Sequence, residues 1–281
     1  MTTGTSLTPA QEELKAEFVR VRGTWNDAWE SILRLDPGFL SAYLEFSAVP
    51  WRKNHLEDKV KEFVYIAADA AATHLYTPGI RQHIRAALAF GATKEELMEV
   101  IELTSTLGIH ASNIGVPLLM EVLTEEGLRD GPAPLSERQE RLKAEFTETR
   151  GYWHSFWDEL LEVDPELFEA YTELSSVPWR TGVLEPKVKE LIYTAFDASA
   201  THLYVPGLKE HMRNAVRHGA TREEIMEVLE IVSVIGIHAA TVAAPILVEE
   251  LAEFAGSAES AESAPSAESA PSAESARAGE A

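Results

Sequence analysis

Six of the nine histidines recur as three pairs at one fixed sequence offset, and histidine is the side chain best suited to moving protons near neutral pH. The pairs are His74 and His202, His83 and His211, and His110 and His238. A neutral imidazole can relay a proton, ligate a metal ion or fill a polar niche in a core. Residue type alone leaves all three roles open.

Two aspartates accompany these pairs in surroundings that disfavour a charge. Asp69 lies within a run of alanines, and Asp197 repeats it beside Phe196 and Ala198. A buried carboxylate either pairs with a cation or has its pKa shifted toward neutrality, and both are common at catalytic sites. We therefore predict acid–base chemistry, with structural hydrogen bonding as the alternative role of the aspartates. The predicted acid–base residues are His74, His83 and Asp69, with His202, His211 and Asp197 as their counterparts.

Paired cations and aromatic residues supply what a substrate would need. Arginine recurs at Arg85 and Arg213 and at Arg52 and Arg180. A guanidinium forms forked hydrogen bonds with a carboxylate, so these residues are predicted to hold one. The recurring aromatic pairs are Trp51 and Trp179, and Tyr76 and Tyr204. They are predicted to wall a pocket for a planar or lactone-sized ligand, with core packing as the alternative.

The elements that must position these residues belong to a duplicated chain. Residues 7–126 form a first repeat, 135–254 form a second, and a linker containing Gly and Pro joins them at 127–134. Residues 1–6 and 255–281 are predicted to be disordered. The second of these is a Ser, Ala, Glu and Pro tail without a large apolar side chain, so it has nothing to bury.

Within each repeat the apolar residues follow a helical period, and no alternating strand pattern is present, which predicts an all-α fold. One long first helix is predicted to carry Trp25 and Trp29 on one face. The stretch 56–75 is predicted to be a central, buried helix, because it is almost wholly apolar from Phe63 to Ala72. A capping box at Thr93 is predicted to open the last long helix.

The amino-acid composition limits the classes of partner and the kinds of chemistry that are expected. With 24 Lys and Arg against 46 Asp and Glu, the net charge of −22 repels phosphate backbones and anionic membranes. We expect a small-molecule substrate, no nucleic acid and no membrane. Zero cysteines exclude disulfides, thiolate metal sites and thiol redox chemistry. No signal peptide and no apolar run of about 18 to 20 residues is recognised, so a cytoplasmic location is expected.

Several short segments together resemble the carboxymuconolactone decarboxylase superfamily, which includes the AhpD-type alkylhydroperoxidases. These segments are Lys61-Glu62, residues 83–87 (HIRAA), 91–96 (GATKEE) and 98–100 (MEV), in the latter two thirds of the repeat. The resemblance implies two tandem all-helical AhpD-like domains. It also implies self-association as trimers or hexamers, so we expect a homo-oligomer, namely a trimer of tandem chains.

The resemblance also bears on the reaction. The peroxidase branch uses a Cys-x-x-Cys pair flanked by Glu and His, and Glu62 and His83 resemble the flanking residues. In this chain, residues 74–77 stand where the cysteines would be, so thiol peroxidase chemistry is excluded. The decarboxylase branch needs no thiol and no organic cofactor, because it protonates a carbon as carbon dioxide leaves.

The leading hypothesis is therefore a cofactor-independent lyase or isomerase acting on a small carboxylated or lactone substrate, with one site in each repeat. In it the His83 and His74 pairs exchange protons, arginine holds the carboxylate, and aspartate orients an imidazole. One alternative is an enzyme that binds Zn, Fe or Mn. Its metal ligands would be His74, His83 and His110 with Glu62 or Asp69 in one repeat, and His202, His211, His238 and Glu190 in the other. The other alternative is a non-catalytic oligomeric scaffold that binds small molecules.

Overall fold

The computed structural model describes residues 6–262, which contain helices and turns and no strand, confirming the all-α prediction. The chain divides into two compact units. One holds Ser41–His238, and the other comprises the chain on either side of it. The Ser41–His238 unit draws on both repeats, so compact units and sequence repeats follow different divisions. All the paired histidines belong to this unit.

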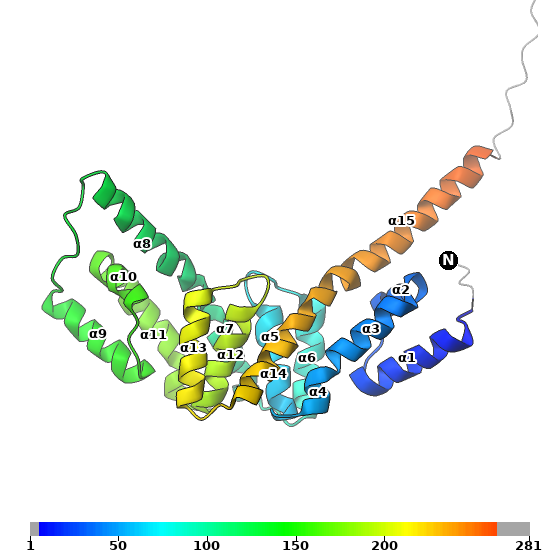
Figure 1. Cartoon of the computed structure of the whole chain (residues 1–281), viewed down its shortest axis with the longest axis horizontal. Helices are drawn as coiled ribbons and strands as arrows, with labels where there is room; N and C mark the ends of the chain where they lie inside the picture. The colour runs from blue at the N-terminus through cyan, green and yellow to red at the C-terminus, as the bar shows by residue number, and fades with distance from the viewer. Residues whose placement is uncertain (1–5, 263–281) are drawn as a thin grey trace, which may run out of the picture. The chain divides into compact units, whose positions relative to one another are not determined.

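Two helices form the centre of the Ser41–His238 unit: α5 (Asp58–Ala70) and its counterpart α12 (Pro186–Ala198), which pack against each other (Figure 1). Phe63 on α5 and Phe196 on α12 are fully buried. A helix that is apolar on every side must be enclosed by others, so the predicted central helix is confirmed, with a later start and an earlier end.

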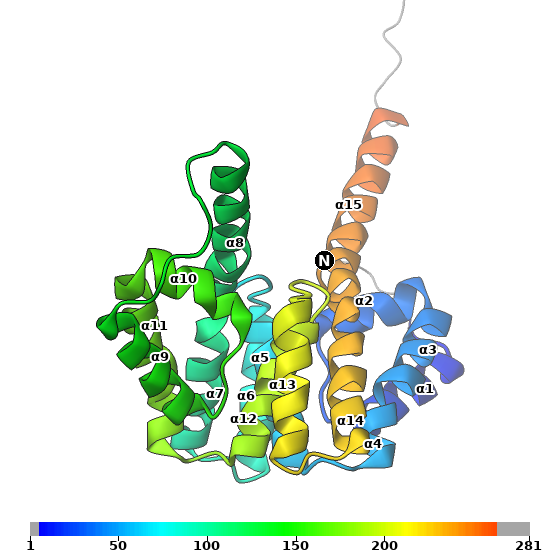
Figure 2. The same ribbon diagram turned by 60° about the vertical axis from the view of Figure 1, so that its left-hand side comes forward.

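Four further helices enclose this pair. They are α6 (Thr77–Ala89), α7 (Lys94–Ser105), α13 (Val205–Arg217) and α14 (Arg222–Ser233). Helix α6 packs on α5 and α13 packs on α12, whereas α7 and α14 each contact both central helices. Figure 2 shows α13 standing in front of α12. The two repeats therefore share one helical core.

The predicted capping box is present at the start of α7. The Thr93 side chain accepts a hydrogen bond from the Glu96 N–H, and the Glu96 side chain accepts one from the Thr93 N–H. The same reciprocal pair opens α14 at Thr221 and Glu224. Each box satisfies two backbone donors that a helix start leaves unpaired.

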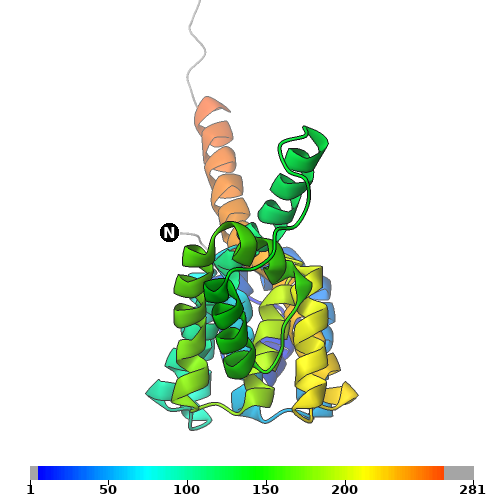
Figure 3. The same ribbon diagram turned by 90° about the vertical axis from the view of Figure 1, so that its left-hand side faces the viewer.

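The predicted last long helix is interrupted. A 3-10 turn at Thr106–Ile109 ends α7, and α8 (His110–Glu125) begins at a histidine. The second copy repeats this with a 3-10 turn at Val234–Ile237 before α15 (His238–Glu262). Figure 3 shows α8, in dark green, extending above the end of α13, in yellow. The turn sets His110 and His238 at the start of a new helix.

The tail prediction needs correction at its beginning. Helix α15 continues past residue 255 to Glu262, since Ala and Glu are good helix formers. The rest of the predicted tail, 263–281, and residues 1–5 of the predicted N-terminal segment lie outside the described residues.

The prediction of a single long first helix was wrong. Helix α1 (Pro9–Arg22) ends at Gly23, whose φ of 70° is left-handed, and α2 (Asp27–Leu35) starts after it. Trp25 therefore lies between two helices. The second copy has the same break, where α9 (Glu137–Arg150) ends at a glycine with φ 75°. The remaining elements are α3 (Pro37–Ser47), α4 (Val49–Lys53), a 3-10 turn at Ser155–Trp157, α10 (Asp158–Val163) and α11 (Pro165–Thr181).

Two buried glutamates cross between the repeats, and we call them the crossed glutamates. Glu99 on α7 accepts hydrogen bonds from the backbone N–H groups of Val183 and Leu184, at 2.9 and 2.8 Å. Glu227 on α14 accepts from the N–H groups of His55 and Leu56, at 2.6 and 3.3 Å. Each repeat thus supplies a carboxylate that satisfies backbone donors of the other.

Within residues 6–262, two helical stretches are long and apolar enough to cross a bilayer, namely Lys94–Glu125 and Arg222–Ser257. This test uses length and composition alone, and core helices of water-soluble proteins also pass it. From the sequence we expected no apolar run of that length, and the structure differs from this expectation. The expected absence of a membrane partner stays a prediction.

Candidate functional site

The six paired histidines gather into two clusters, and each cluster takes a histidine from the other repeat. Cluster 1 consists of Glu62, Asp69, His74, His83 and His238. Cluster 2 consists of the counterparts Glu190, Asp197, His202, His211 and His110. Both clusters lie within the Ser41–His238 unit.

A histidine–glutamate pair forms the inner end of cluster 1. Nδ1 of His83, on α6, lies 2.6 Å from Oε2 of Glu62, on α5, and both side chains are buried. The His83 ring stacks on Tyr65 with centroids 4.2 Å apart and an interplanar angle of 4°. A ring held by a hydrogen bond and a stack has one orientation, and its Nε2 atom faces Asp69 at 3.9 Å.

A second histidine pair forms the outer end. Nε2 of His74 lies 2.8 Å from Nδ1 of His238, which lies 3.6 Å from Oδ1 of Asp69. His74 is only half-buried, whereas Asp69 is fully buried. Tyr76 stacks on the His238 ring with centroids 3.8 Å apart. The ionisable groups therefore run from a buried pair to one near the surface.

Cluster 2 reproduces this geometry. His211 Nδ1 lies 2.6 Å from Glu190 Oε2, and His110 Nδ1 lies 2.7 Å from His202 Nε2. The His110 to Asp197 Oδ1 distance is 3.7 Å. Two copies of one arrangement, built from diverged neighbours, argue that the arrangement itself is constrained.

A glycine allows the central aspartate its position. Pro78 opens α6, and a Cβ built on the next residue, Gly79, would lie 1.9 Å from Oδ2 of Asp69 and 2.7 Å from the Tyr76 ring. Gly207 stands in the same relation to Asp197, at 2.4 Å. The Pro78-Gly79 pair therefore starts α6 and leaves room for the carboxylate.

The loop that presents His74 carries an unusual backbone. Leu75 has φ 50°, in the left-handed region that costs a residue with a Cβ about 1 to 2 kcal/mol. Its counterpart Leu203 has the same φ of 50°. Hydrogen bonds from the N–H groups of His74 and Leu75 to Ala71 hold the turn, at 2.8 and 3.0 Å. Strain that recurs beside both clusters supports a functional role.

Burial sets the charge state of both clusters. Burial raises the pKa of Asp69 to about 8, and the nearby Glu62 adds to the effect. Burial also raises the pKa of Asp197 to about 7. Burial and neighbouring imidazoles lower the pKa values of His238 and His110 to about 3. These two rings are therefore uncharged at neutral pH and each keeps a nitrogen lone pair.

Comparison with known proteins identifies the relatives of this chain. The profile of the Carboxymuconolactone decarboxylase family matches residues 37–109 and 165–250, one segment in each repeat. The chain belongs to this family. A crystal structure from Burkholderia xenovorans LB400, named as a candidate gamma-carboxymuconolactone decarboxylase subunit, has 62% sequence identity and a TM-score of 0.85. That match covers 88% of this chain and 100% of the other. The curated proteins include no match.

Membership of the carboxymuconolactone decarboxylase family confirms the resemblance and the tandem helical fold, with one family segment in each repeat. The segments include both histidine–glutamate pairs and both clustered aspartates. They leave out His110, which lies one residue beyond the first segment. The second segment extends past its counterpart, His238.

The predicted grouping of histidines needs correction. We had placed His110 with His74 and His83 of its own repeat, but its ring contacts His202 of the other repeat. His238 contacts His74 in the same way. The reason is the 3-10 turn before each of these residues, which carries the chain toward the opposite repeat.

The predicted arginine anchors lie on the surface. Arg52 pairs with Glu45 at 3.0 Å, and Arg180 pairs with Glu173 at 2.8 Å. Arg85 is exposed, and Arg213 is exposed and pairs with Glu210. None of these three contacts is with an imidazole, so the prediction that the four arginines anchor a carboxylate at the clusters is not supported.

The predicted aromatic wall separates into two groups. Tyr76 and Tyr204 stack on the His238 and His110 rings, so they line the clusters. Trp179 donates a hydrogen bond from Nε1 to the Tyr193 hydroxyl at 3.5 Å, and Tyr193 stacks on His211 of cluster 2. Trp51 lies under the Lys61 ammonium, 4.8 Å from its ring. The tyrosines therefore contact cluster histidines directly, whereas the tryptophans contact Tyr193 and Lys61.

One buried arginine was not among the site residues predicted from the sequence. Arg150 is 5% exposed, and its guanidinium carbon lies 5.0 Å from the Trp179 ring and 5.2 Å from the Tyr193 ring. Tyr193 in turn stacks on His211 at 4.4 Å. Arg150 therefore approaches cluster 2 as a cation enclosed by aromatic faces. The available signal was that arginine recurs at this position, as Arg22, in the first repeat.

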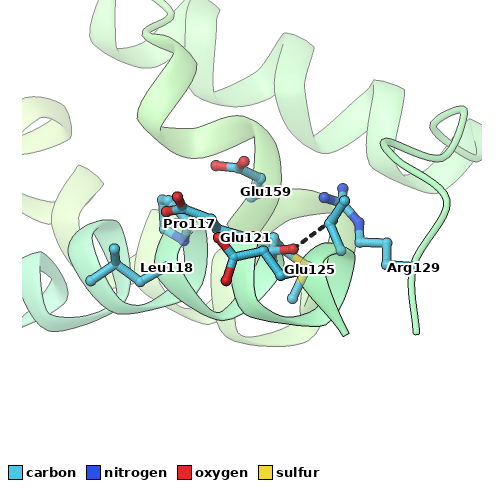
Figure 4. A pocket seen from close by; sticks show the side chains of 8 residues that line it. Pro117, Leu118, Glu121, Glu125, Arg129 and Glu159 are labelled. Carbon is cyan, nitrogen blue, oxygen red and sulfur yellow. Dashed lines mark hydrogen bonds between the residues drawn. The ribbon is translucent and has the colours of Figure 1, made fainter. Parts of the chain in front are cut away.

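Two of the cavities among the described residues lie in the Ser41–His238 unit. One of about 460 Å³ is lined by Pro117, Leu118, Glu121, Arg129 and other residues around α8 (Figure 4). The other, of about 390 Å³, lies between the starts of α5 and α12 and includes Lys59. Neither of these cavities is lined by a residue of either cluster.

Proposed function

We propose that the protein is a lyase or isomerase of the carboxymuconolactone decarboxylase type, acting on a small carboxylated or lactone substrate. The observation that carries the proposal is the buried histidine–glutamate pair, found at 2.6 Å in both clusters. Family membership and the Burkholderia relative support the reaction class.

The histidine–glutamate pair determines which ring nitrogen of His83 carries the proton. Because the Glu62 carboxylate accepts from Nδ1 of His83, Nε2 is the ring atom left to exchange a proton with substrate. The glutamate also stabilises the imidazolium that forms when Nε2 takes up a proton. His83 is thus suited to act as general acid in one direction and general base in the other.

In a decarboxylation the bond between the ring carbon and the carboxylate breaks, and its electron pair is delocalised into the adjacent unsaturated carbonyl system. Carbon dioxide leaves, and the His83 imidazolium gives its Nε2 proton to the carbon. The imidazole then regains a proton from solvent. Asp69, His238 and half-buried His74 continue the site from His83 toward the surface, with successive distances of 3.6 and 2.8 Å, and we propose that turnover requires them.

Arg150 is the residue we propose as the carboxylate anchor of cluster 2. Its guanidinium is enclosed by aromatic faces, and an enclosed cation gains from an anionic partner. The sequence contains zero cysteines, so the proposed activity includes no thiol peroxidase chemistry.

The test is carbon dioxide release from a panel of small lactone carboxylates, including gamma-carboxymuconolactone. Replacing His83→Gln and His211→Gln together should abolish turnover while helicity by circular dichroism is kept. His218→Gln, an exposed residue outside the clusters, is the matched control and should leave turnover unchanged. Full turnover in the double variant would remove the acid–base assignment.

A further inference from the structure

Three ligand-type atoms converge at the outer end of cluster 1. They are Nε2 of His74, Nδ1 of His238 and a carboxylate oxygen of Asp69, all within 4.8 Å of one another. Their counterparts from His202, His110 and Asp197 converge in the same way. We call these sets triad 1 and triad 2. They are distinct from the histidine–glutamate pairs, which lie deeper.

The aspartate of each triad lacks the partners that a buried carboxylate requires. Both carboxylate oxygens of Asp69, and both of Asp197, are without a hydrogen-bond partner, although the side chains are fully buried. A buried polar group without a partner costs free energy, and a buried charge costs more. A cation held between the aspartate and the two imidazoles would supply the missing interaction.

The ligand types specify the class of ion. Two imidazole nitrogens and one carboxylate oxygen suit divalent first-row transition metals such as zinc, iron, cobalt or manganese, rather than calcium or magnesium. Three protein ligands leave coordination positions open, as catalytic metal sites do. We propose that each triad binds one such ion, giving two ions per chain, and that each site takes two ligands from one repeat and one from the other.

The environment of each triad fits metal binding. Tyr76 stacks on His238, which fixes the plane of a ligand ring. Nε2 of His83 lies 3.9 Å from Oδ2 of Asp69, whereas Nδ1 of His238 lies 3.6 Å from Oδ1. Outer groups that orient ligands in this way are a regular feature of metal sites. His83, which the sequence suggested as a ligand, is therefore not one of the ligands in this proposal.

The rival explanation is a direct hydrogen bond between the two imidazoles, whose nitrogens lie at hydrogen-bond distance. In that case Asp69 and Asp197 stay protonated and no metal is bound. The two explanations differ in metal content and in spectra, so neither readout depends on the proposed enzymatic activity.

The experiment titrates the full chain, freed of metal with a chelator, with Co²⁺ while the visible d–d absorption is recorded, and measures bound cobalt by mass spectrometry. We expect two equivalents per chain. His238→Gln should remove one equivalent, His110→Gln should remove the other, and the double variant should remove both. His218→Gln is the control with both equivalents kept. Circular dichroism checks that each variant is folded.

Asp69→Asn keeps the shape of the side chain and should also remove one equivalent, so it decides the matter if His238→Gln does not fold. The proposal is overturned if the wild-type chain binds well below one equivalent. It is also overturned if folded His238→Gln and His110→Gln variants each bind as much cobalt as the wild type. Loss of turnover in His83→Gln with full cobalt binding would separate the metal sites from the acid–base proposal.

Discussion

Nε2 of His74 lies 2.8 Å from Nδ1 of His238, although one residue belongs to the first repeat and the other to the second. The reciprocal contact joins His110 to His202 at 2.7 Å. Neither repeat therefore holds a complete cluster. Each cluster takes one histidine from the other repeat, and the equivalent histidine of its own repeat lies in the other cluster.

This exchange makes a specific prediction for combined variants. His74→Gln and His238→Gln act on one cluster, so the pair together should lose no more activity than either alone, about half of kcat if the clusters are equal. His238→Gln with His110→Gln act on different clusters, so this pair should abolish turnover. Steady-state kinetics on an identified substrate provides the measurement. Additive loss within cluster 1 would contradict the shared site.

Gly79→Ala should disable cluster 1, because the added Cβ would overlap the Asp69 carboxylate. The overlap is with a fully buried group, so we expect destabilisation of about 1 to 3 kcal/mol in urea unfolding, together with loss of one active cluster. Gly108→Ala is the control, since nothing lies within 4 Å of its added Cβ. Equal stability of the two variants would show that the close approach is unimportant.

The crossed glutamates predict how stability depends on pH. Burial alone would raise the pKa of Glu99, but hydrogen bonds from Thr181 and from the N–H groups of Leu184 and Val183 hold it below the ordinary value. A carboxyl whose pKa is lower when folded contributes stability above its unfolded pKa, and loses it as pH falls through the folded value. The free energy of unfolding should therefore drop below about pH 4.5.

Glu99→Gln tests this, with urea unfolding measured from pH 7 to pH 3. The variant should be less stable at pH 7 and should lose less stability on acidification than the wild type. Glu145→Gln, at an exposed helix position, should leave the pH profile unchanged. A wild-type profile in Glu99→Gln would assign the acid sensitivity to other carboxyl groups.

Arg150→Lys should weaken substrate binding at cluster 2. The charge is kept but the fork that matches a carboxylate is lost, and hydrogen bonds to charged groups contribute about 1.5 to 3 kcal/mol. We expect KM to rise about 10-fold to 100-fold with a smaller change in kcat. The measurement is best made with His83→Gln present, so that cluster 2 alone turns over. An unchanged KM would exclude Arg150 as the anchor.

Self-association remains a prediction, and helix α8 gives it a surface. Ile114, Leu118, Leu119 and Val122 of this helix are each about half exposed, at 52, 55, 48 and 51%. A contiguous apolar face of this kind marks an interaction site. We expect a trimer by light scattering, and dissociation when Leu118→Glu and Val122→Glu are combined. A monomeric wild type would refute it.

The sequence was sufficient for the helical class and for the residues of the clusters. Helical periodicity and the recurrence of His83, Asp69 and Glu62 in both copies pointed to them directly. The partner of His110 was not accessible in this way. The recurrence of a residue in both repeats shows that the two positions are equivalent. Which residues contact each other across the repeats depends on how the repeats pack, and the spacing of residues in one sequence does not reveal that packing.

Three errors in the prediction from sequence were avoidable. Arg85 follows His83 by two residues, which places the two side chains on nearly opposite faces of a helix, so both could not reach one site. Glu99 recurs as Glu227 within apolar helices, the same pattern that singled out Asp69. Gly23 likewise marked the end of the first helix, because glycine commonly terminates helices in the left-handed conformation.

The exchange of His110 and His238 has a consequence for how such a protein could arise. A protein with a single copy of the fold could assemble these clusters only by meeting a second molecule, at a rate and occupancy set by its concentration. Joining two copies in one polypeptide makes that encounter intramolecular, so both clusters form at any dilution. The halves are then free to diverge, because each no longer has to recognise an identical copy of itself.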